Sequence, residues 1–211
     1  MMSDLVFYTN PMSRGRIVRW MLEETGQPYE TEIIAFGAHR ENADFLAINP
    51  MGKVPVLTHA DAIVTEAPAI CAYLADAFPE AGLAPDPGSR ERAAYYRWLF
   101  FAAGPIEQAV TTKALGVTVP DDKRGMVGFG SLDLVLDTLE NHLKSRDYIA
   151  TDRFTAADLY VGAHIGWGMM FGTIDKRPVF ESYFGRLCER PAAIRAQEID
   201  DRLAAEMQPK S

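Results

Sequence analysis

The chain has 211 residues, 48% hydrophobic and 24% charged, which indicates a globular protein of one large domain or two modest ones. Its 29 acidic residues outnumber its 21 basic ones, for a formal charge of −8, and no basic run could neutralise phosphates, which argues against a nucleic-acid partner. The N-terminus lacks signal-peptide features, and no stretch approaches the roughly 18 apolar residues of a membrane span. We therefore expect a soluble, cytoplasmic protein without a membrane partner.

The first 34 residues predict a strand, a helix and a second strand. Residues 5–8 form a β-prone run that ends at the turn residues 9–11. From residue 13 or 14 to residue 24, apolar residues recur at helical spacing before the stop signal of Gly26 and Pro28. Residues 29–34 alternate as in a strand. Two strands joined through a helix are parallel if they share a sheet.

A second module follows, in which residues 54–57 and 62–65 form two short apolar runs spaced as a hairpin. A helix then begins near Pro68, a residue that suits the first helical position, and runs to about residue 77. The order βαβ then ββα is the thioredoxin arrangement. The two cysteines, Cys71 and Cys188, lie in apolar helical patterns and are expected to be small buried hydrophobes, and the absence of a C-x-x-C pair argues against dithiol chemistry.

The remainder of the chain reads as helical. Residues 78–89 contain three prolines and two glycines, which indicates a linker. We expect an α/β domain over residues 1–80, a linker over 81–89 and an all-α domain over 90–211. The helical patterns of the last part cover residues 90–115, 123–144, 155–171, 179–189 and 192–206.

The segment from Asn49 to Leu57 places Pro55 just before a run that should be a buried strand. Proline is poorly tolerated in a central strand. A cis Val54–Pro55 bond would resolve the conflict and would leave the Val54 backbone N–H and C=O able to pair with an extended peptide ligand. An ordinary loop proline is the alternative.

Glu66 and Ala67 stand at the mouth of the helix that begins near Pro68. The free N–H groups of a helix start favour an anion, while a carboxylate favours an amine. Glu66 with the Ala67 N–H could therefore hold the ammonium and the carboxylate of an α-amino acid head group. Alternatively, Glu66 only offsets the helix dipole.

Together with residues 8–16, Tyr-Thr-Asn-Pro-Met-Ser-Arg-Gly-Arg, these segments resemble the glutathione transferase family, and the resemblance covers nearly the whole chain. The Asn-Pro-x-Gly-x-Val-Pro stretch is similar to the family's cis-proline loop. Glu66 falls where the family grips the γ-glutamyl end of glutathione. The resemblance implies the glutathione transferase fold, a thioredoxin-like α/β domain followed by an all-α helical bundle.

Residues 154–159 provide an independent match in the second domain. Thr155 followed by Asp158 reads as a capping box with aspartate in place of the commoner glutamate or glutamine. It resembles the family's N-capping motif, whose role is in folding. We therefore interpret Asp158 as structural.

A glutathione transferase must stabilise the thiolate of glutathione, usually with a hydroxyl donor. Ser13 stands at the start of the first helix, where serine-type members keep their hydroxyl, and it is our first candidate. Tyr8 resembles the tyrosine of other members, and Asn10 offers an amide donor; both stay open. No cysteine lies in this region, which makes the chain similar to bacterial serine or theta-like members rather than cysteine-type ones.

The resemblance also implies the residues that bind glutathione, which besides Val54, Pro55 and Glu66 are His39, Lys53 and Ala67. His39 and Lys53 resemble the positions that reach the glycyl carboxylate. Ala67 departs from the family, which usually has a Ser or Thr hydroxyl there. Losing a hydrogen bond to a charged group could weaken binding by roughly 1.5 to 3 kcal/mol.

An apolar pocket for the electrophile is expected against the first helix of the second domain, and aromatic residues recur there at helical spacing. An aromatic stripe of this kind can equally be core. The residues expected to line the pocket are Met12, Trp98, Phe101, Gly104 and Trp167.

The resulting hypothesis is a glutathione transferase that conjugates the thiolate to a small hydrophobic electrophile in detoxification, with glutathione as co-substrate and no metal. The resemblance implies a homodimer. One alternative is a weakly catalytic or non-catalytic binding protein on the same fold, favoured by Ala67. Another is a glutathione-dependent peroxidase, isomerase or lyase, which the sequence does not separate from a conjugating enzyme.

Overall fold

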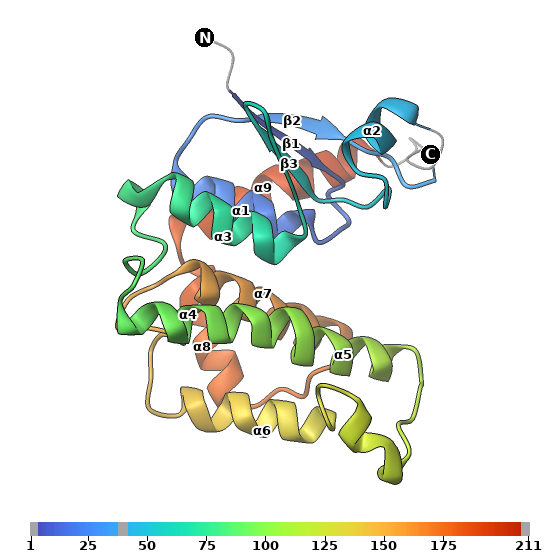
Figure 1. The fold of residues 1–211 in the computed structure, drawn as a ribbon, viewed down its shortest axis with the longest axis vertical. Helices are drawn as coiled ribbons and strands as arrows, with labels where there is room; N and C mark the ends of the chain where they lie inside the picture. The colour runs from blue at the N-terminus through green and yellow to red at the C-terminus, as the bar shows by residue number, and fades with distance from the viewer. Residues whose placement is uncertain (1–3, 38–41, 208–211) are drawn as a thin grey trace. The chain divides into compact units, whose positions relative to one another are not determined.

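The computed structural model describes residues 4–37 and 42–207, and the chain divides into two compact units (Figure 1). Residues 1–83 and 190–211 form the first, which we call the α/β unit. Residues 84–189 form the second, the helical unit. The last helix of the chain, expected in the helical domain, thus belongs to the α/β unit.

The α/β unit is built on a four-stranded sheet of order β2-β1-β3-β4, whose strands are β1 (Leu5–Thr9), β2 (Glu30–Ile33), β3 (Val56–His59) and β4 (Ala62–Thr65). β1 is parallel to β2, as the βαβ pattern predicts, and antiparallel to β3, which forms the predicted hairpin with β4. In the register, Val56 lies opposite both Tyr8 and Thr65. The carboxyl ends of β1 and β4 therefore meet the start of β3 at one edge, which we call the site edge.

Helices cover both faces of this sheet (Figure 1). One face packs against α1 (Gly15–Thr25) and α3 (Ala67–Ala77), and the Phe7 ring lies 5.1 Å from the guanidinium of Arg19 on α1. The other face carries Tyr8, whose ring lies 6.0 Å from that of Phe45. Phe45 belongs to α2 (Ala43–Ile48), a short helix that the sequence did not predict and that Asn42 caps by accepting from the Phe45 N–H at 3.0 Å. Because side chains alternate along a strand, Tyr8 faces away from α1.

Helix α9 (Pro191–Glu206) packs along α1 within the α/β unit. Its central contact is an ion pair of Arg19 and Asp200, 2.7 Å apart and each only 1% exposed. Helical periodicity in the sequence reveals the helix but not the surface that it covers, and for that reason the expected domain boundary differs. Three further ion pairs join the helix or the residue before it to α1, namely Arg16 with Asp201, Arg195 with Glu23 and Arg190 with Glu24.

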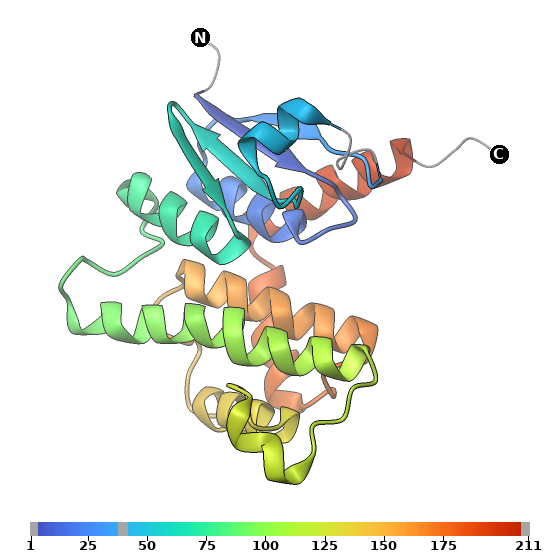
Figure 2. The same cartoon turned by 45° about the vertical axis from the view of Figure 1, so that its right-hand side comes forward.

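The helical unit contains α4 (Arg90–Phe101), α5 (Glu107–Ala114), α6 (Leu132–Leu143), α7 (Ala156–Phe171) and α8 (Pro178–Cys188). Helix α7 is buried almost all round and packs against α4 and α8. Figure 2 shows α4 and α7 side by side. A 3₁₀ turn at Pro79–Ala81 precedes the unit, and another at Asp121–Met126 precedes α6.

Two of the expected helices are interrupted. The pattern over residues 90–115 contains a π-helical segment, Ala102–Ile106, because Pro105 has no N–H for the regular ladder. The pattern over 123–144 becomes α6 only from Leu132, after a stretch that includes Gly130 at φ +65°. Ser131 then caps α6 by accepting from the Leu134 N–H at 3.2 Å.

The capping box at the start of α7 is confirmed. Asp158 is fully buried and accepts from the Thr155 N–H and hydroxyl, both at 2.9 Å. It also accepts from the Ile149 N–H at 2.6 Å and the Tyr183 hydroxyl at 2.9 Å. Burial raises the pKa of Asp158, and these hydrogen bonds oppose the rise.

Both cysteines are free thiols. Cys71 is fully buried, which confirms its expected place, and Cys188 is half-buried. Burial raises the pKa of both thiols, that of Cys188 to about 11. Neither is poised as a thiolate near neutral pH.

Candidate active site

The turn between β1 and α1 is organised by Asn10, which has no exposed surface. Its side-chain amide donates to the Ile34 carbonyl at 2.9 Å, and its Oδ1 accepts from the Met12 N–H at 2.9 Å. The Ser13 hydroxyl donates to the Asn10 carbonyl at 2.7 Å and accepts from the Gly15 N–H at 2.9 Å. Asn10 thus fastens the turn to the end of β2, and Ser13 joins the turn to the first turn of α1.

Gly15 permits a close approach at this point. A Cβ added at Gly15 would overlap the Thr9 hydroxyl and crowd Ser13. Any larger residue would push the start of α1 away from the end of β1. The glycine therefore brings the N-terminus of the helix to the site edge, where its N–H groups favour negative charge.

The loop before β3 contains a cis Val54–Pro55 peptide bond, the first of the two alternatives that the sequence left open. The Asn49 side chain shapes this loop by donating to the Lys53 carbonyl at 2.8 Å and accepting from the Met51 N–H at 3.2 Å. Within the described part of the chain, the backbone N–H and C=O of Val54 make no hydrogen bond. Val54 thus offers a donor and an acceptor to an extended ligand.

Helix α3 starts at the same edge. Because Val56 pairs with Thr65, the next residues outward, Pro55 and Glu66, are neighbours beyond the end of the ladder. Glu66 is exposed and holds φ at +68°, a strained value for a residue other than glycine and one that clusters at functional sites. The Ala67 N–H has no acceptor among the described residues, so it is available to an anion.

A cavity of about 280 Å³ opens at the site edge, within the α/β unit. Arg14 and Lys53 both line it and both are exposed, while no carboxylate is among its described lining residues. The electrostatic potential of such a cavity favours an anionic ligand. Its full lining is Met12, Ser13, Arg14, Ile34, Phe36, Gly52, Lys53 and Val54.

Comparison with known proteins agrees with this geometry. Residues 3–76 match the family description "Glutathione S-transferase, N-terminal domain", and residues 111–191 match "Glutathione S-transferase, C-terminal domain". The chain belongs to the glutathione S-transferase family. Glutathione S-transferase GstB of Escherichia coli strain K12 is 31% identical over 182 residues, which span 81% of this chain and 86% of the relative. Glutathione S-transferase 3 of Zea mays is 29% identical over 90% of this chain and 92% of the relative.

Solved structures of transferases show the same fold. A glutathione transferase from Methylococcus capsulatus superposes with a TM-score of 0.78 at 30% identity, covering 94% of this chain and 99% of its own. A sphingomonad glutathione S-transferase in complex with glutathione superposes with a TM-score of 0.77 at 30% identity, covering 93% and 98%. The glutathione transferase fold expected from the sequence is confirmed.

In this family member, four of the predicted site residues gather around the cavity, namely Met12, Ser13, Lys53 and Val54. Pro55 is buried beside Val54, and Glu66 and Ala67 lie at the same edge without lining the cavity. The predicted residue His39 lies outside the described residues.

The other two candidates for thiol activation are placed differently. Tyr8 lies on the face of the sheet that α2 covers, and it does not line the cavity. Asn10 is fully buried, and both polar atoms of its side chain are hydrogen-bonded to the turn and to Ile34. Of the three candidates, Ser13 alone lines the cavity.

Sequence reasoning did not single out four lining residues as site residues: Arg14, Ile34, Phe36 and Gly52. Arg14 and Gly52 stand inside motifs that were recognised, so their neighbours could have indicated them. Ile34 and Phe36 reach the cavity from the loop after β2. The Asn10 side chain holds this loop by donating to the Ile34 carbonyl. No local pattern marks such a contact.

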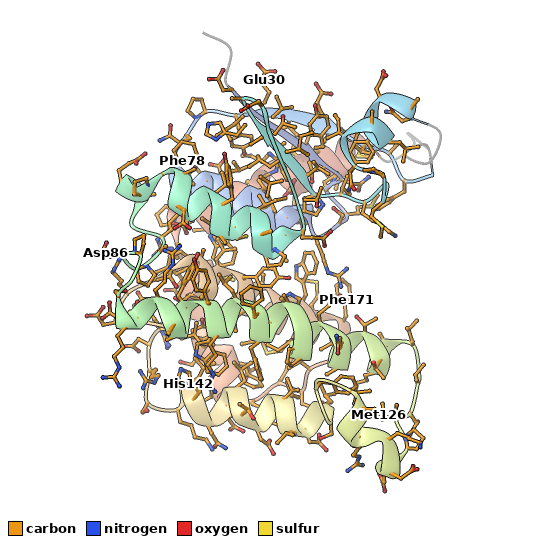
Figure 3. The ribbon with its side chains drawn as sticks, in the orientation of Figure 1. Glu30, Phe78, Asp86, Met126, His142 and Phe171 are labelled. Atoms are coloured by element: carbon orange, nitrogen blue, oxygen red, sulfur yellow. The ribbon has the colours of Figure 1, made fainter. Side chains whose placement is uncertain are left out.

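The residues expected to line an electrophile pocket in the helical unit differ in exposure. Trp98 is 1% exposed, and its ring lies 4.4 Å from that of His142 and 5.2 Å from that of Phe101, which places it in the core of the unit. His142 lies on α6 and faces α4 (Figure 3). Phe101, Gly104 and Trp167 are half-buried, and a Cβ added at Gly104 would meet no atom within 4 Å.

The described residues contain neither a metal-binding cluster nor a membrane-spanning helix. In residues 4–37 and 42–207, no group of three or more His, Cys, Asp or Glu side chains gathers as a metal site. No helix in the same ranges combines the length and the apolar character needed to cross a membrane.

Proposed function

We propose that this glutathione transferase binds glutathione in the cavity at the site edge and transfers its thiolate to a small hydrophobic electrophile. The observation that supports this most directly is the juxtaposition in one cavity of Ser13 with the backbone groups of Val54, which make no hydrogen bond to another described residue. An extended tripeptide can pair with Val54 as an added strand, and this pairing would hold its cysteinyl sulfur near the start of α1.

The ends of the tripeptide would be held by charge. Lys53 and Arg14 supply positive charge for a carboxylate, and His39 remains a proposed partner of the glycyl end. Glu66 would accept from the ammonium of the γ-glutamyl group, and the free Ala67 N–H would donate to its carboxylate.

Ser13 is proposed to stabilise the thiolate, which makes this a serine-type member. Its hydroxyl proton points to the Asn10 carbonyl, and rotation about the C–O bond would turn it to the sulfur while Oγ still accepts from Gly15. The proton lost by the thiol passes to solvent, the thiolate attacks the electrophilic carbon, and the leaving group departs with its electron pair. The positive end of α1 and the charge of Arg14 would both lower the pKa of the bound glutathione thiol.

A second candidate is a weakly catalytic binding protein, because Ala67 supplies no hydroxyl to the γ-glutamyl carboxylate. The same site could support a peroxidase, isomerase or lyase reaction, in which the thiolate attacks a different electrophile. A homodimer and a cytoplasmic location in detoxification also stay proposals.

The test compares the wild type with Ser13→Ala and a matched control, Ser131→Ala, which removes a helix-start hydroxyl of the helical unit. Calorimetry measures glutathione affinity, ultraviolet absorbance measures the thiolate, and a panel of aryl halides, epoxides and peroxides measures turnover. We expect Ser13→Ala to bind glutathione but to raise the pKa of its thiol, and Ser131→Ala to behave as wild type.

Two results would contradict these proposals. An unchanged thiol pKa in Ser13→Ala would remove Ser13 from the mechanism. A wild type that does not bind glutathione at millimolar concentration would contradict the proposed transferase function and favour the second candidate.

A further inference from the structure

Besides the two hydrogen bonds of the Ser13 hydroxyl itself, two further points fasten the turn that carries Ser13. The first is Asn10, whose side chain bonds Ile34 and the Met12 N–H. The second is the carbonyl of Pro11, which accepts from Arg16 Nε at 2.5 Å. Proline has no N–H, and within the described part of the chain this is the one hydrogen bond of the Pro11 backbone.

Arg16 is itself held from the far end of the chain. Its Nη1 donates to Asp201 on α9 at 2.7 Å. The neighbouring Asp200 pairs with Arg19, and burial of that pair to 1% exposure fixes how α9 lies against α1. Two consecutive carboxylates of α9 therefore engage two arginines one turn apart on α1, and the outer one orients the guanidinium that reaches Pro11.

We propose that Arg16 is a positioning residue of the thiol site, which Asp201 holds in place so that it fixes the Pro11 carbonyl and thereby the orientation of Ser13. The role rests on the proposed function of Ser13. Arg16 does not line the cavity, so it acts through the turn and not on glutathione.

Folding stability alone does not explain the ion pair of Arg16 and Asp201. The side chains of Arg16 and Asp201 are 29% and 53% exposed, and solvent-exposed ion pairs contribute little to folding. The buried Arg19–Asp200 pair already joins the two helices. What Arg16 adds is a charge-assisted hydrogen bond to a carbonyl inside the turn, and small displacements of a catalytic group cost much of the rate.

The chain offers a matched control in Arg195. Its guanidinium also joins a carboxylate and a carbonyl across α1 and α9, donating to Glu23 Oε2 at 3.1 Å and to the Glu23 carbonyl at 3.3 Å. Glu23 lies near the C-terminal end of α1, away from the turn. Arg195→Gln therefore removes the same kind of contact without touching the site.

The experiment compares Arg16→Gln, Asp201→Asn and Arg195→Gln with the wild type. The readouts are the pH profile of kcat/KM with an aryl halide, the absorbance of bound thiolate, and hydrogen exchange of the amides of residues 12–15 in the ligand-free protein. We expect Arg16→Gln to lower kcat/KM about tenfold, to raise the apparent thiol pKa by about one unit and to speed exchange in the turn. Asp201→Asn should do the same more weakly, and Arg16→Lys, which keeps the positive charge and an N–H donor group, should recover part of the loss.

The outcomes separate this inference from the proposed function. A wild type that binds glutathione, with Arg16→Gln matching Arg195→Gln in thiol pKa and in turn exchange, overturns the positioning role and leaves the transferase function standing. A wild type that does not bind glutathione overturns both. Faster turn exchange with an unchanged thiol pKa would show that Arg16 orders the turn without positioning Ser13, which also overturns the inference.

Discussion

Among the helix starts that carry a hydroxyl residue, those of α7 and α1 differ in what surrounds the hydroxyl. At α7, the Thr155 hydroxyl donates to Asp158, and both residues are fully buried. At α1, Ser13 is half-buried, lines a cavity and, among the described residues, makes side-chain hydrogen bonds to backbone atoms of its own turn alone. Because a buried, fully bonded group cannot meet a ligand, the first hydroxyl serves folding while the second can serve chemistry.

A hydroxyl residue at a helix start in the sequence therefore does not by itself distinguish a hydroxyl that stabilises the fold from one that can act on a ligand. A hydroxyl residue near a helix start, such as the N-cap Thr155 of α7, becomes structural when a carboxylate accepts its proton. The hydroxyl stays available to a ligand when it donates to a backbone carbonyl and can rotate away from that carbonyl.

Removing the carboxylate of the buried cap should have the largest effect. Asp158→Ala leaves the N–H groups of Ile149 and Thr155 and the hydroxyls of Thr155 and Tyr183 without an acceptor. We expect the free energy of unfolding to fall by about 3 kcal/mol, measured by chemical denaturation. The thiol pKa of glutathione bound to the remaining folded protein should be unchanged; a shift would mean that the cap also acts on the site.

The hydroxyl at the cavity should show the opposite signature. Ser13→Ala should lower kcat/KM about a hundredfold, as removal of one donor to a developing anion does elsewhere. Thr155→Ala should cost about 1 kcal/mol of unfolding free energy and leave the kinetics of folded protein intact. Steady-state kinetics and denaturation of both variants check the pair, and the contrast breaks if the two variants change the same quantity.

Among the cations of the cavity, Lys53 is the one that the sequence pointed to. Lys53→Ala should raise the Kd of glutathione about fivefold, because it removes a positive charge from the cavity. The effect stays modest because the side chain is exposed and solvent screens its charge. The loss should shrink as salt is added. Calorimetry at two ionic strengths checks this, with Lys144→Ala, an exposed lysine of the helical unit, as control. Equal affinities of the two variants would place the ligand away from Lys53.

A third hydroxyl gives the smallest effect. Burial first, and then its hydrogen bond to Glu23, raise the pKa of Tyr29 to about 12 from an ordinary value of 10.0. The folded protein then holds this proton more tightly than the unfolded chain. The contribution of Tyr29 to the free energy of unfolding is therefore fully present below pH 10 and is lost as pH rises from 10 to about 12. Tyr29→Phe should flatten the fall in that window in a pH series of denaturation curves. An identical slope would assign the fall to other groups.

Much of this was readable from the sequence because the signals are local. The βαβ unit, the hairpin, the cis proline and the capping box each depend on residues a few positions apart. The short helix α2 was missed because six residues carry little periodicity, and its stability comes from the Asn42 cap and the burial of Phe45.

The remainder depends on contacts between distant residues. Nothing near Ile34 or Phe36 indicates that their loop joins the cavity, since the contact is made by Asn10, 24 positions before Ile34. The packing of α9 was hidden for the same reason, because the partner of Asp200 is 181 positions away. The proposal of Ser13 in preference to Asn10 and Tyr8 likewise rests on which side chain lines the cavity, which the sequence does not contain.

The ion pair of Arg19 and Asp200 also has a consequence for how the protein is made. Among the described elements, α9 is the last to be synthesised, yet it covers the first helix. The helical unit is continuous in the chain and can fold while translation proceeds, whereas Arg19 of α1 lacks its ion-pair partner Asp200 until α9 has emerged. A nascent chain arrested before α9 would therefore leave exposed the flank of α1 that α9 covers in the folded protein.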